Sequence, residues 1–406
     1  MKHIIILADG MADEPIAELG GLTPLAAAST PSFDWLCTHG RTGLLNTAPK
    51  GYEPGSEVAH LSLLGYDLDK VFEGRGTLEA ASMGIEIEPN EMAMRCNLIC
   101  IENGDIKNHS AGHITDEEAC ELIHFLNDNL ADERVRFYPG VSYRHLLKIK
   151  GADKRIICIP PHDVPGTPFK DVLVKAQVPE AQATADLIND LILHSQDLLA
   201  NNPVNLARKA KGKDAANSIW PWSPGYKPAM DTLQNKYGIG NGVVISAVDL
   251  IRGIGIYAGL KPVMVEGATG LWDTNYEGKA QAAIDALKGD NDFVFLHIEA
   301  PDEAGHQGEY ELKRKAIEDI DHRVCKPIIE AVKNMNEPVA IAVLPDHPTP
   351  CKLRTHSGKP VPFIIYKPGE REEKEDKKLI KFSEDSACLG DYGILKDDEF
   401  IDEFLK

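Results

Sequence analysis

The chain has 406 residues and a formal net charge of −20. A chain of this length can bury a large core and exceeds the usual size of one domain, so we expect two domains. The acidic balance argues against a nucleic-acid partner, which needs clustered Lys and Arg, and an anionic substrate would need metals or local cations to offset the field of the protein.

The sequence contains no pattern typical of a membrane-spanning segment or of a secretory signal. No apolar run approaches the roughly 18 residues that span a bilayer, and only a few apolar residues precede Asp9. The eight cysteines form no C-x-x-C pair and have no secretory context. We therefore expect a soluble cytoplasmic protein with reduced thiols and no membrane partner. The sequence gives no indication of the oligomeric state.

Strand-like and helix-like segments alternate along most of the chain, which favours an α/β fold with a doubly wound sheet. The first strand-like segment covers residues 3–8, and Asp9 and Gly10 close it.

Residues 54–61 form the next informative segment, Pro-Gly-Ser-Glu-Val-Ala-His-Leu. This pattern puts Ser56 at or beside the N-terminus of a helix, where free N–H groups and the macrodipole favour an anion such as a phosphoryl group. The alternative interpretation is a serine that only caps the helix. A serine hydroxyl becomes a good nucleophile where a base or a metal lowers its pKa, so the choice depends on what lies nearby.

Between residues 89 and 179 the pattern changes to a small α+β domain. Strand-like segments at 92–101, 135–138, 143–149 and 155–159 surround one helix that begins near Thr115 with the sequence Thr-Asp-Glu-Glu of a capping box. We interpret this segment as an insertion into a larger domain made of residues 1–88 and 180–406. The helix at about 179–201 is expected to return the chain to the larger domain.

Candidate metal ligands follow two apolar strand-like runs late in the chain. Asp302 and His306 come after residues 293–298, and Asp346, His347 and His356 come after residues 339–344. Active sites of open α/β sheets collect at the carboxyl ends of strands. Each residue alone has an ordinary explanation as a turn former or a surface group, but the set predicts two divalent metals. Mixed oxygen and imidazole donors suit Mn, Zn, Fe or Mg.

The candidate substrate contacts are Lys279, Arg144, His162 and Asp163. Lys279 follows Asp-Thr-Asn-Tyr-Glu-Gly and could meet a phosphate, although a solvated helix lysine is an equal alternative. Arg144, His162 and Asp163 belong to the inserted segment and could equally be polar surface residues.

Taken together, these motifs resemble those of the cofactor-independent phosphoglycerate mutases of the archaeal type, within the alkaline phosphatase superfamily. The motifs are Asp9-Gly10, the segment Gly55 to Leu61, Pro301-Asp302 with His306, and Asp346-His347 with His356. The resemblance covers essentially the whole chain. It implies an alkaline-phosphatase-like fold, a small phosphorylated substrate, two divalent metal ions (Mn, Zn, Mg or related) and no requirement for 2,3-bisphosphoglycerate.

The resemblance also implies residue roles. One metal would be held by Asp302, His306 and His356, and the second by Asp9, Asp346, His347 and the Ser56 hydroxyl. Ser56 would become phosphoserine while 3-phosphoglycerate and 2-phosphoglycerate interconvert. The inserted domain would carry cationic groups that grip the substrate and would close over the site as a lid.

Two departures from the family pattern keep an alternative open. His113 stands where archaeal-type mutases usually have an arginine, and residues 217–225 contain Trp-Pro-Trp where those mutases tend to have Arg-Gly. A guanidinium is the natural bidentate partner of carboxylate and phosphate. A bacterial subgroup that has this Trp-Pro-Trp sequence has been proposed to phosphorylate homoserine. The second hypothesis is therefore a homoserine-kinase-like phosphotransferase, or a phosphatase. A metal-stabilised binding protein without activity is a third, but every matching site position is filled.

Overall fold

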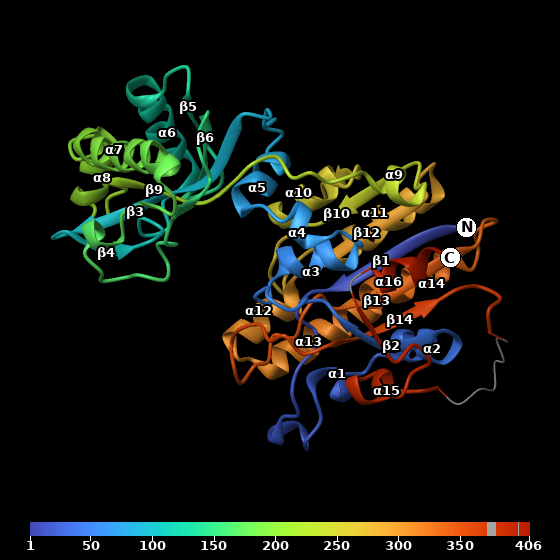
Figure 1. The fold of residues 1–406 in the computed structure, drawn as a ribbon. Coiled ribbons are helices and arrows are strands. Elements are labelled where there is room, and N and C mark those ends of the chain that lie inside the picture. Colours follow the sequence, from blue (N-terminus) through green and yellow to red (C-terminus); the bar gives the residue numbers. More distant parts are fainter. Residues whose placement is uncertain (372–378, 397) are drawn as a thin grey trace. The chain divides into compact units, whose positions relative to one another are not determined.

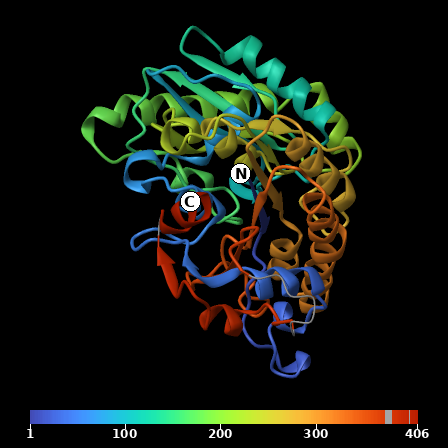
Figure 2. The same ribbon diagram turned by 90° about the vertical axis from the view of Figure 1, so that its right-hand side faces the viewer.

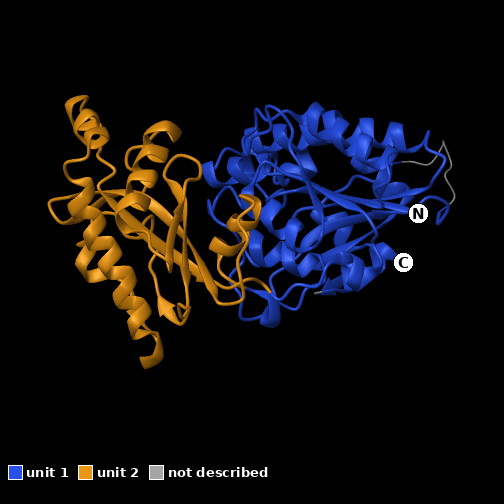
Figure 3. Ribbon diagram, turned by 90° about the horizontal axis from the view of Figure 1, so that it is seen from above, with its two compact units in different colours: residues 1–72, 229–406 blue, residues 73–228 orange. Residues whose placement is uncertain are grey.

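The computed structural model describes residues 1–371, 379–396 and 398–406. The chain divides into two compact units (Figure 1 and Figure 3). Unit 1 contains residues 1–72 and 229–406, and unit 2 contains residues 73–228. Each unit has its own sheet and its own apolar core.

An eight-stranded sheet forms the centre of unit 1, in the order β11-β10-β12-β1-β13-β14-β2-β15. β1 lies between β12 and β13 and is parallel to both, whereas β14 is antiparallel to β13 and to β2. The predicted doubly wound α/β fold is therefore confirmed, with one reversed strand that makes the sheet mixed. The strands are β1 (Lys2–Ala8), β2 (Arg41–Asn46), β10 (Gly242–Ile245), β11 (Lys261–Val263), β12 (Phe293–Ile298), β13 (Val339–Leu344), β14 (Val361–Tyr366) and β15 (Ile394–Lys396).

Helices cover both faces of this sheet, because the side chains of buried parallel strands alternate between two layers (Figure 1 and Figure 2). On one face, Ile4 and Ile6 of β1 belong to a core cluster with residues of α2 (Pro31–His39), α11 (Tyr276–Lys288) and α14 (Lys326–Val332).

On the other face lie α3 (Ser56–Leu63), α10 (Asp249–Tyr257) and α16 (Glu399–Leu405). His60 of α3 packs edge-on against Phe295 of β12, and Phe404 of α16 packs against His3 of β1. The remaining helices of unit 1 are α1 (Pro24–Ala27), α4 (Leu68–Val71), α9 (Leu233–Tyr237), α12 (Ala300–Gln307), α13 (Tyr310–Asp319) and α15 (Glu384–Cys388).

The loops after β1, β12 and β13 meet at one edge of the sheet, because these three strands are parallel neighbours. The loop after β1 turns at Gly10, which has a φ of 63°. A Cβ at Gly10 would lie 2.6 Å from the Cα of Asp302, so a larger residue would push the two loops apart. The Gly10 N–H donates to Asp346 Oδ1 at 3.1 Å. Glycine thus allows three acidic loops to converge.

Unit 2 is built on a five-stranded antiparallel sheet in which β3 pairs with β4, β6 and β9. The helix predicted to begin near Thr115 is confirmed as α6, and the Thr115 hydroxyl accepts a hydrogen bond from the Glu118 N–H. The elements are α5 (Arg75–Ser82), β3 (Glu91–Glu102), β4 (Asp105–Asn108), α6 (Asp116–Leu130), β5 (Val135–Tyr138), β6 (Arg144–Lys150), β7 (Ile156–Ile157), β8 (Lys175–Ala176), α7 (Gln182–Leu199), α8 (Pro203–Ala210) and β9 (Ser218–Gly225).

The boundaries of unit 2 are wider than the inserted segment 89–179 expected from the sequence. The expected return of the helix at about 179–201 to the larger domain is wrong, because α7 buries Ala185, Ile188 and Ile192 in the core of unit 2. β9 then adds a strand to the same sheet. An amphipathic pattern shows that one helix face is buried, but it does not show which sheet covers that face.

Candidate metal centre

The first group of candidate ligands joins the ends of β1 and β13 in unit 1. His347 Nε2 lies 3.6 Å from Asp9 Oδ1 and 3.2 Å from Asp346 Oδ2. All three side chains are buried. One ligand atom from each lies within 4.8 Å of the others, so a single cation could contact all three.

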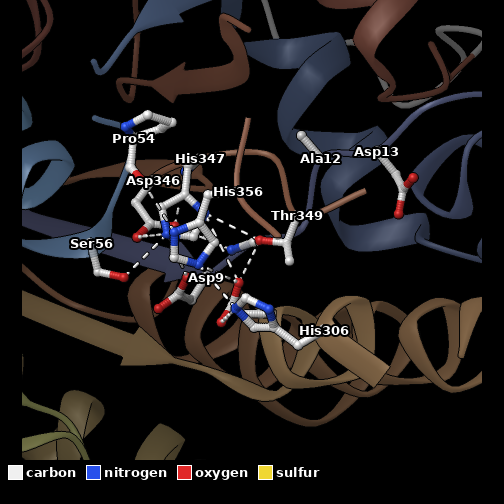
Figure 4. Close-up of polar contacts among 12 residues, drawn as sticks. Asp9, Ala12, Asp13, Pro54, Ser56, His306, Asp346, His347, Thr349 and His356 are labelled. Carbon is white, nitrogen blue, oxygen red and sulfur yellow. Dashed lines mark hydrogen bonds and ion pairs between the residues drawn. The ribbon is translucent and has the colours of Figure 1, made fainter. Parts of the chain in front are cut away.

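The second group lies beside it, on the loop after β13 and on α12. His306 Nε2 is 3.2 Å from Asp302 Oδ2, and His356 Nε2 is 3.6 Å from Asp302 Oδ1. The two histidine Nε2 atoms are 3.0 Å apart. His347 connects the groups, since its ring stacks on that of His356 with a centroid distance of 3.8 Å (Figure 4). The structure therefore brings together every acidic and histidine ligand proposed from the sequence.

Ser56 is the first residue of α3, and its hydroxyl faces this cluster. Ser56 Oγ lies 3.1 Å from His347 Nε2 (Figure 4). The N-cap of α3 is Gly55, and no side chain caps this helix end. The alternative in which Ser56 only caps the helix is therefore wrong. Ser56 thus stands at the N-terminus of the helix, where the macrodipole favours an anion.

Three histidines point Nε2 at the cluster, and the other ring nitrogen of each is held by a hydrogen bond. Nδ1 of His306 donates to the carbonyl of Arg354 at 3.1 Å, and Nδ1 of His356 donates to the carbonyl of Pro54 at 3.3 Å. Nδ1 of His347 lies 3.2 Å from Thr349 Oγ1, whose hydroxyl donates to Asp302. Such bonds orient imidazoles that bind metals.

The donor set fits divalent cations in spacing as well. Bonds of about 2.0–2.2 Å to a tetrahedral metal put neighbouring ligand atoms about 3.3–3.6 Å apart, close to the separations in both groups. Among the described residues, Asp9 Oδ1 and Asp346 Oδ2 are buried and have no hydrogen-bond partner. Buried carboxylate oxygens are stable only when paired, so a cation would satisfy both.

The electrostatics of the cluster lead to the same expectation. Burial, followed by the charges of Asp346 and Asp302, raises the pKa of Asp9 well above its ordinary value. Burial raises the pKa of Asp346 too, but the imidazoles of His347 and His60 outweigh it and hold that pKa low. Burial lowers the pKa of His347, and the neutral ring is the form that binds metal. The raised pKa of Asp9 shows that this site disfavours a further negative charge in the absence of a cation.

Two histidines that were not singled out from the sequence support these ligands. His297 Nε2 donates to Asp9 Oδ2 at 2.8 Å, and its Nδ1 accepts from Ser246 Oγ at 3.0 Å. His60 Nδ1 donates to the carbonyl of Ser56 at 2.7 Å. A signal for each was present, since His297 interrupts an otherwise apolar strand and His60 follows Ser56 by one helical turn.

Lys279 is almost completely buried in unit 1, with 1% of its surface exposed. The solvated alternative for this lysine is therefore wrong. Its ammonium donates to the carbonyl of His297 at 3.3 Å, and the side chain of the same His297 donates to Asp9. Burial lowers the pKa of Lys279 to about 8. Burial also raises the pKa of the neighbouring Glu299 to about 8.

The lowered pKa of Lys279 predicts a dependence of stability on pH. The unfolded chain protonates this amine near the ordinary pKa of 10.5, and the folded chain does so only near about 8. Between these values the unfolded state binds more protons, so the free energy of unfolding rises with pH. In metal-free protein, urea unfolding should show wild type gaining stability over Lys279→Met from about pH 8 to 10. A constant difference across this range would contradict the lowered pKa.

The other candidate substrate residues belong to unit 2. His113 is exposed and ends a run of three residues, Ala111, Gly112 and His113, with φ values of 47°, 64° and 52°. Non-glycine residues rarely adopt this conformation, and such strain concentrates at functional sites. His162 Nε2 lies 3.7 Å from Asp163 Oδ1, and both side chains are about half exposed.

Unit 2 contains a buried arginine that was not singled out from the sequence, Arg95, whose Nε lies 3.3 Å from Glu79 Oε2. The Arg95 guanidinium lies 4.6 Å from the centroid of the Trp222 ring, and the His162 ring lies 5.3 Å from the same indole. Burial, followed by the charges of Arg75 and Arg144, lowers the pKa of Arg95. The segment 217–225 has Trp-Pro-Trp where the family tends to have Arg-Gly. A guanidinium is nevertheless present here, because that of Arg95 lies over the ring of Trp222. The available signal was a charged residue inside the buried strand β3.

Comparisons with known proteins show what the chain is related to. Residues 37–205 match the family model of 2,3-bisphosphoglycerate-independent phosphoglycerate mutase. Over its whole length the chain is 48% identical to the protein of that name from Methanosarcina acetivorans, across 409 aligned residues and all of both chains. The chain belongs to the family of 2,3-bisphosphoglycerate-independent phosphoglycerate mutases. It is also 45% identical to a probable mutase of this family from Geobacter sulfurreducens, over 98% of each chain.

Solved structures agree with this membership. A protein named PH0037 from Pyrococcus horikoshii superposes with a TM-score of 0.82 at 29% identity, over 100% of this chain and 96% of that one. A cofactor-independent phosphoglycerate mutase from Thermoplasma acidophilum superposes with a TM-score of 0.69 at 27% identity, over 100% and 99% of the two chains. The resemblance to the mutase family inferred from the motifs is confirmed, and the chain is an enzyme of that family. The described residues include two groups that could hold a metal ion. In the part of the chain that the structure describes, no helix is long and apolar enough to cross a membrane.

Proposed function

We propose that this enzyme interconverts 3-phosphoglycerate and 2-phosphoglycerate without 2,3-bisphosphoglycerate, through a phosphoserine at Ser56. One observation carries the proposal. The Ser56 hydroxyl, at the start of a helix, lies 3.1 Å from His347 Nε2, in a cluster of three buried carboxylates and three imidazoles of which that of His347 is buried. Helix N-termini and divalent metals are the two devices that stabilise a phosphoryl group during transfer.

Two divalent ions, Mn, Zn, Mg or related, would be held by this chain. Asp302, His306 and His356 would hold one, and Asp9, Asp346, His347 and the Ser56 hydroxyl would hold the other. When bound, such ions supply the charge that offsets a phosphoryl group and lower the pKa of a hydroxyl.

The chemistry of the chain's own residues then has two balanced steps. Ser56 Oγ attacks the phosphorus of 3-phosphoglycerate, the bond from phosphorus to the C3 oxygen breaks, and the serine proton is passed on to that oxygen. The C2 hydroxyl of the same glycerate next attacks phosphoserine, and its proton returns to Ser56 Oγ. His297 and His60 would keep Asp9 and Ser56 in position throughout, through the hydrogen bonds that they make.

Unit 2 would supply groups that recognise the glycerate carboxylate and the phosphate. His113, Arg144, His162 and Asp163 are the residues proposed from the sequence, and Arg95 joins them because it lies against the ring of Trp222, as His162 does. In unit 1, Lys279 would add a cation near the ligands of the metals. The role of unit 2 as a lid stays a prediction.

Homoserine is the competing acceptor. The relatives from Methanosarcina and Geobacter both carry the mutase name, so a homoserine-kinase-like activity is not favoured. The test incubates purified protein and Mn²⁺ with 3-phosphoglycerate and follows phosphorus NMR. We expect 2-phosphoglycerate to form without release of phosphate. Phosphohomoserine formed from homoserine and ATP, in a preparation that leaves 3-phosphoglycerate unchanged, would overturn the proposal.

The reaction would take place in the cytoplasm. All eight cysteines are free thiols, as a reducing compartment requires. The partner expected is a small phosphorylated substrate rather than a nucleic acid or a membrane.

A further inference from the structure

Lys313 of α13 is a fully buried lysine whose three protons are all used. Its ammonium donates to the carbonyl of Ala12 at 3.0 Å, to the carbonyl of Thr349 at 2.8 Å and to Asp13 Oδ2 at 2.8 Å. The side chains of Lys313 and Asp13 are 0% and 1% exposed. A buried charge is tolerated only with such complete pairing, so this position specifies lysine.

The three acceptors lie on the two loops that carry the ligands of one proposed metal. Ala12 and Asp13 follow Asp9 by three and four residues, and Thr349 follows His347 by two. Figure 4 shows Thr349 at the edge of the ligand cluster, with Ala12 and Asp13 beyond it. One ammonium therefore joins the loop after β1 to the loop after β13.

Asp13 extends the connection through its carboxylate. It accepts hydrogen bonds from the N–H of Cys351 at 3.1 Å and from the N–H of Glu14 at 2.7 Å. The Asp13 N–H is held in turn by Glu384 at 3.2 Å. These bonds fix the backbone on both sides of the ligands, and Thr349 N donates to the Ala12 carbonyl at 3.2 Å between the loops.

We propose that Lys313 and Asp13 form a positioning pair that sets the separation of Asp9 from Asp346 and His347, and with it the affinity for divalent metal. Neither side chain touches the proposed ions or the substrate. Stability alone does not explain the pair, because a buried ion pair often contributes no more than an apolar pair of the same volume. An apolar pair, however, would leave the Ala12 and Thr349 carbonyls and the Cys351 N–H without these partners. The inference rests on the proposed metal site.

The experiment compares Mn²⁺ binding by calorimetry in wild type, Lys313→Met and Asp13→Asn. Substitutions that disturb residues supporting metal ligands typically weaken metal binding by about 10- to 100-fold, and we expect Lys313→Met to fall in this range. Asp13→Asn keeps an acceptor oxygen and should weaken binding less. The absorption spectrum of the Co²⁺-loaded protein should also change in Lys313→Met, because the ligands shift.

Lys2→Met is the matched control. Lys2 is another buried lysine of unit 1, and its ammonium donates to the carbonyls of Leu287 at 2.8 Å and Gly289 at 2.5 Å, at the C-terminal end of α11, which carries none of the proposed ligands. This variant should lose stability but keep the wild-type affinity for Mn²⁺ and the wild-type Co²⁺ spectrum. If Lys2→Met lost as much affinity for Mn²⁺ as Lys313→Met, the loss would follow from lower stability in general, and the positioning role of Lys313 would be refuted.

The possible outcomes distinguish a failure of the proposed metal centre from a failure of the positioning role of Lys313 and Asp13. Wild-type protein that binds no Mn²⁺ would refute the proposed metal centre itself. Wild type that binds Mn²⁺ while a folded Lys313→Met binds it equally well would overturn only the positioning role. If Lys313→Met does not fold, Asp13→Asn decides, since an affinity loss of at least about threefold supports the pair and an unchanged affinity refutes it.

Discussion

Replacing Ser56 with alanine is expected to abolish the interconversion of 3-phosphoglycerate and 2-phosphoglycerate. The change removes one oxygen from a half-buried position at the start of α3, where Gly55 provides the N-cap, so the fold should remain intact. An essential nucleophile contributes far more than a binding contact, and we expect the rate to fall by more than about a hundredfold. Coupled detection of 2-phosphoglycerate gives the rate, and circular dichroism checks the fold.

Ser62→Ala is the matched control, since Ser62 lies on the same helix and is buried. It should keep the activity of the wild type within a few fold. Residual activity of Ser56→Ala above about a hundredth of wild type would remove Ser56 from the mechanism.

Removal of metal should have an effect of the same size. Phosphoryl transfer depends on positioning and on offsetting negative charge, and the cluster of Asp9, Asp302 and Asp346 is itself acidic. Dialysis against a chelator should therefore reduce activity to background, and Mn²⁺ or Zn²⁺ should restore it. Elemental analysis of the restored protein should find two ions per chain.

A ligand variant makes this test specific to the site. His356→Ala removes a donor from only the group around Asp302, so it should retain one ion per chain and lose activity. Full turnover by metal-free wild type, or two retained ions in His356→Ala, would contradict the assignment.

The convergence of the proposed metal ligands could be predicted from the sequence, because each follows a strand whose apolar run is easy to recognise. Asp9, Asp302 and Asp346 come within four residues of the ends of such runs, and parallel neighbours must bring their ends together. This prediction did not require the order of the strands, since the carboxyl ends of any two adjacent parallel strands lie at the same edge of the sheet.

Supporting residues could not be predicted in this way, because their roles depend on contacts between distant parts of the chain. Lys313 lies in an ordinary charged helix sequence, and only the packing of α13 against two loops shows that it is buried. A charged residue inside the apolar run of β3 marks Arg95 as unusual, but its contact with Trp222 could not be predicted, because that ring comes from a strand more than a hundred residues later. The helix α7 was assigned to the wrong unit, because its amphipathic pattern predicts that one face is buried but does not predict which sheet that face packs against.

The most direct measurement of the central claim is mass spectrometry of the peptide that contains Ser56, isolated from enzyme quenched during turnover of 3-phosphoglycerate. We predict that this peptide carries one phosphoryl group on Ser56 in Mn²⁺-loaded wild type, and none in chelator-treated enzyme or in Ser56→Ala. Steady turnover to 2-phosphoglycerate with Ser56 never phosphorylated, or with the phosphoryl group on another residue, would contradict the account.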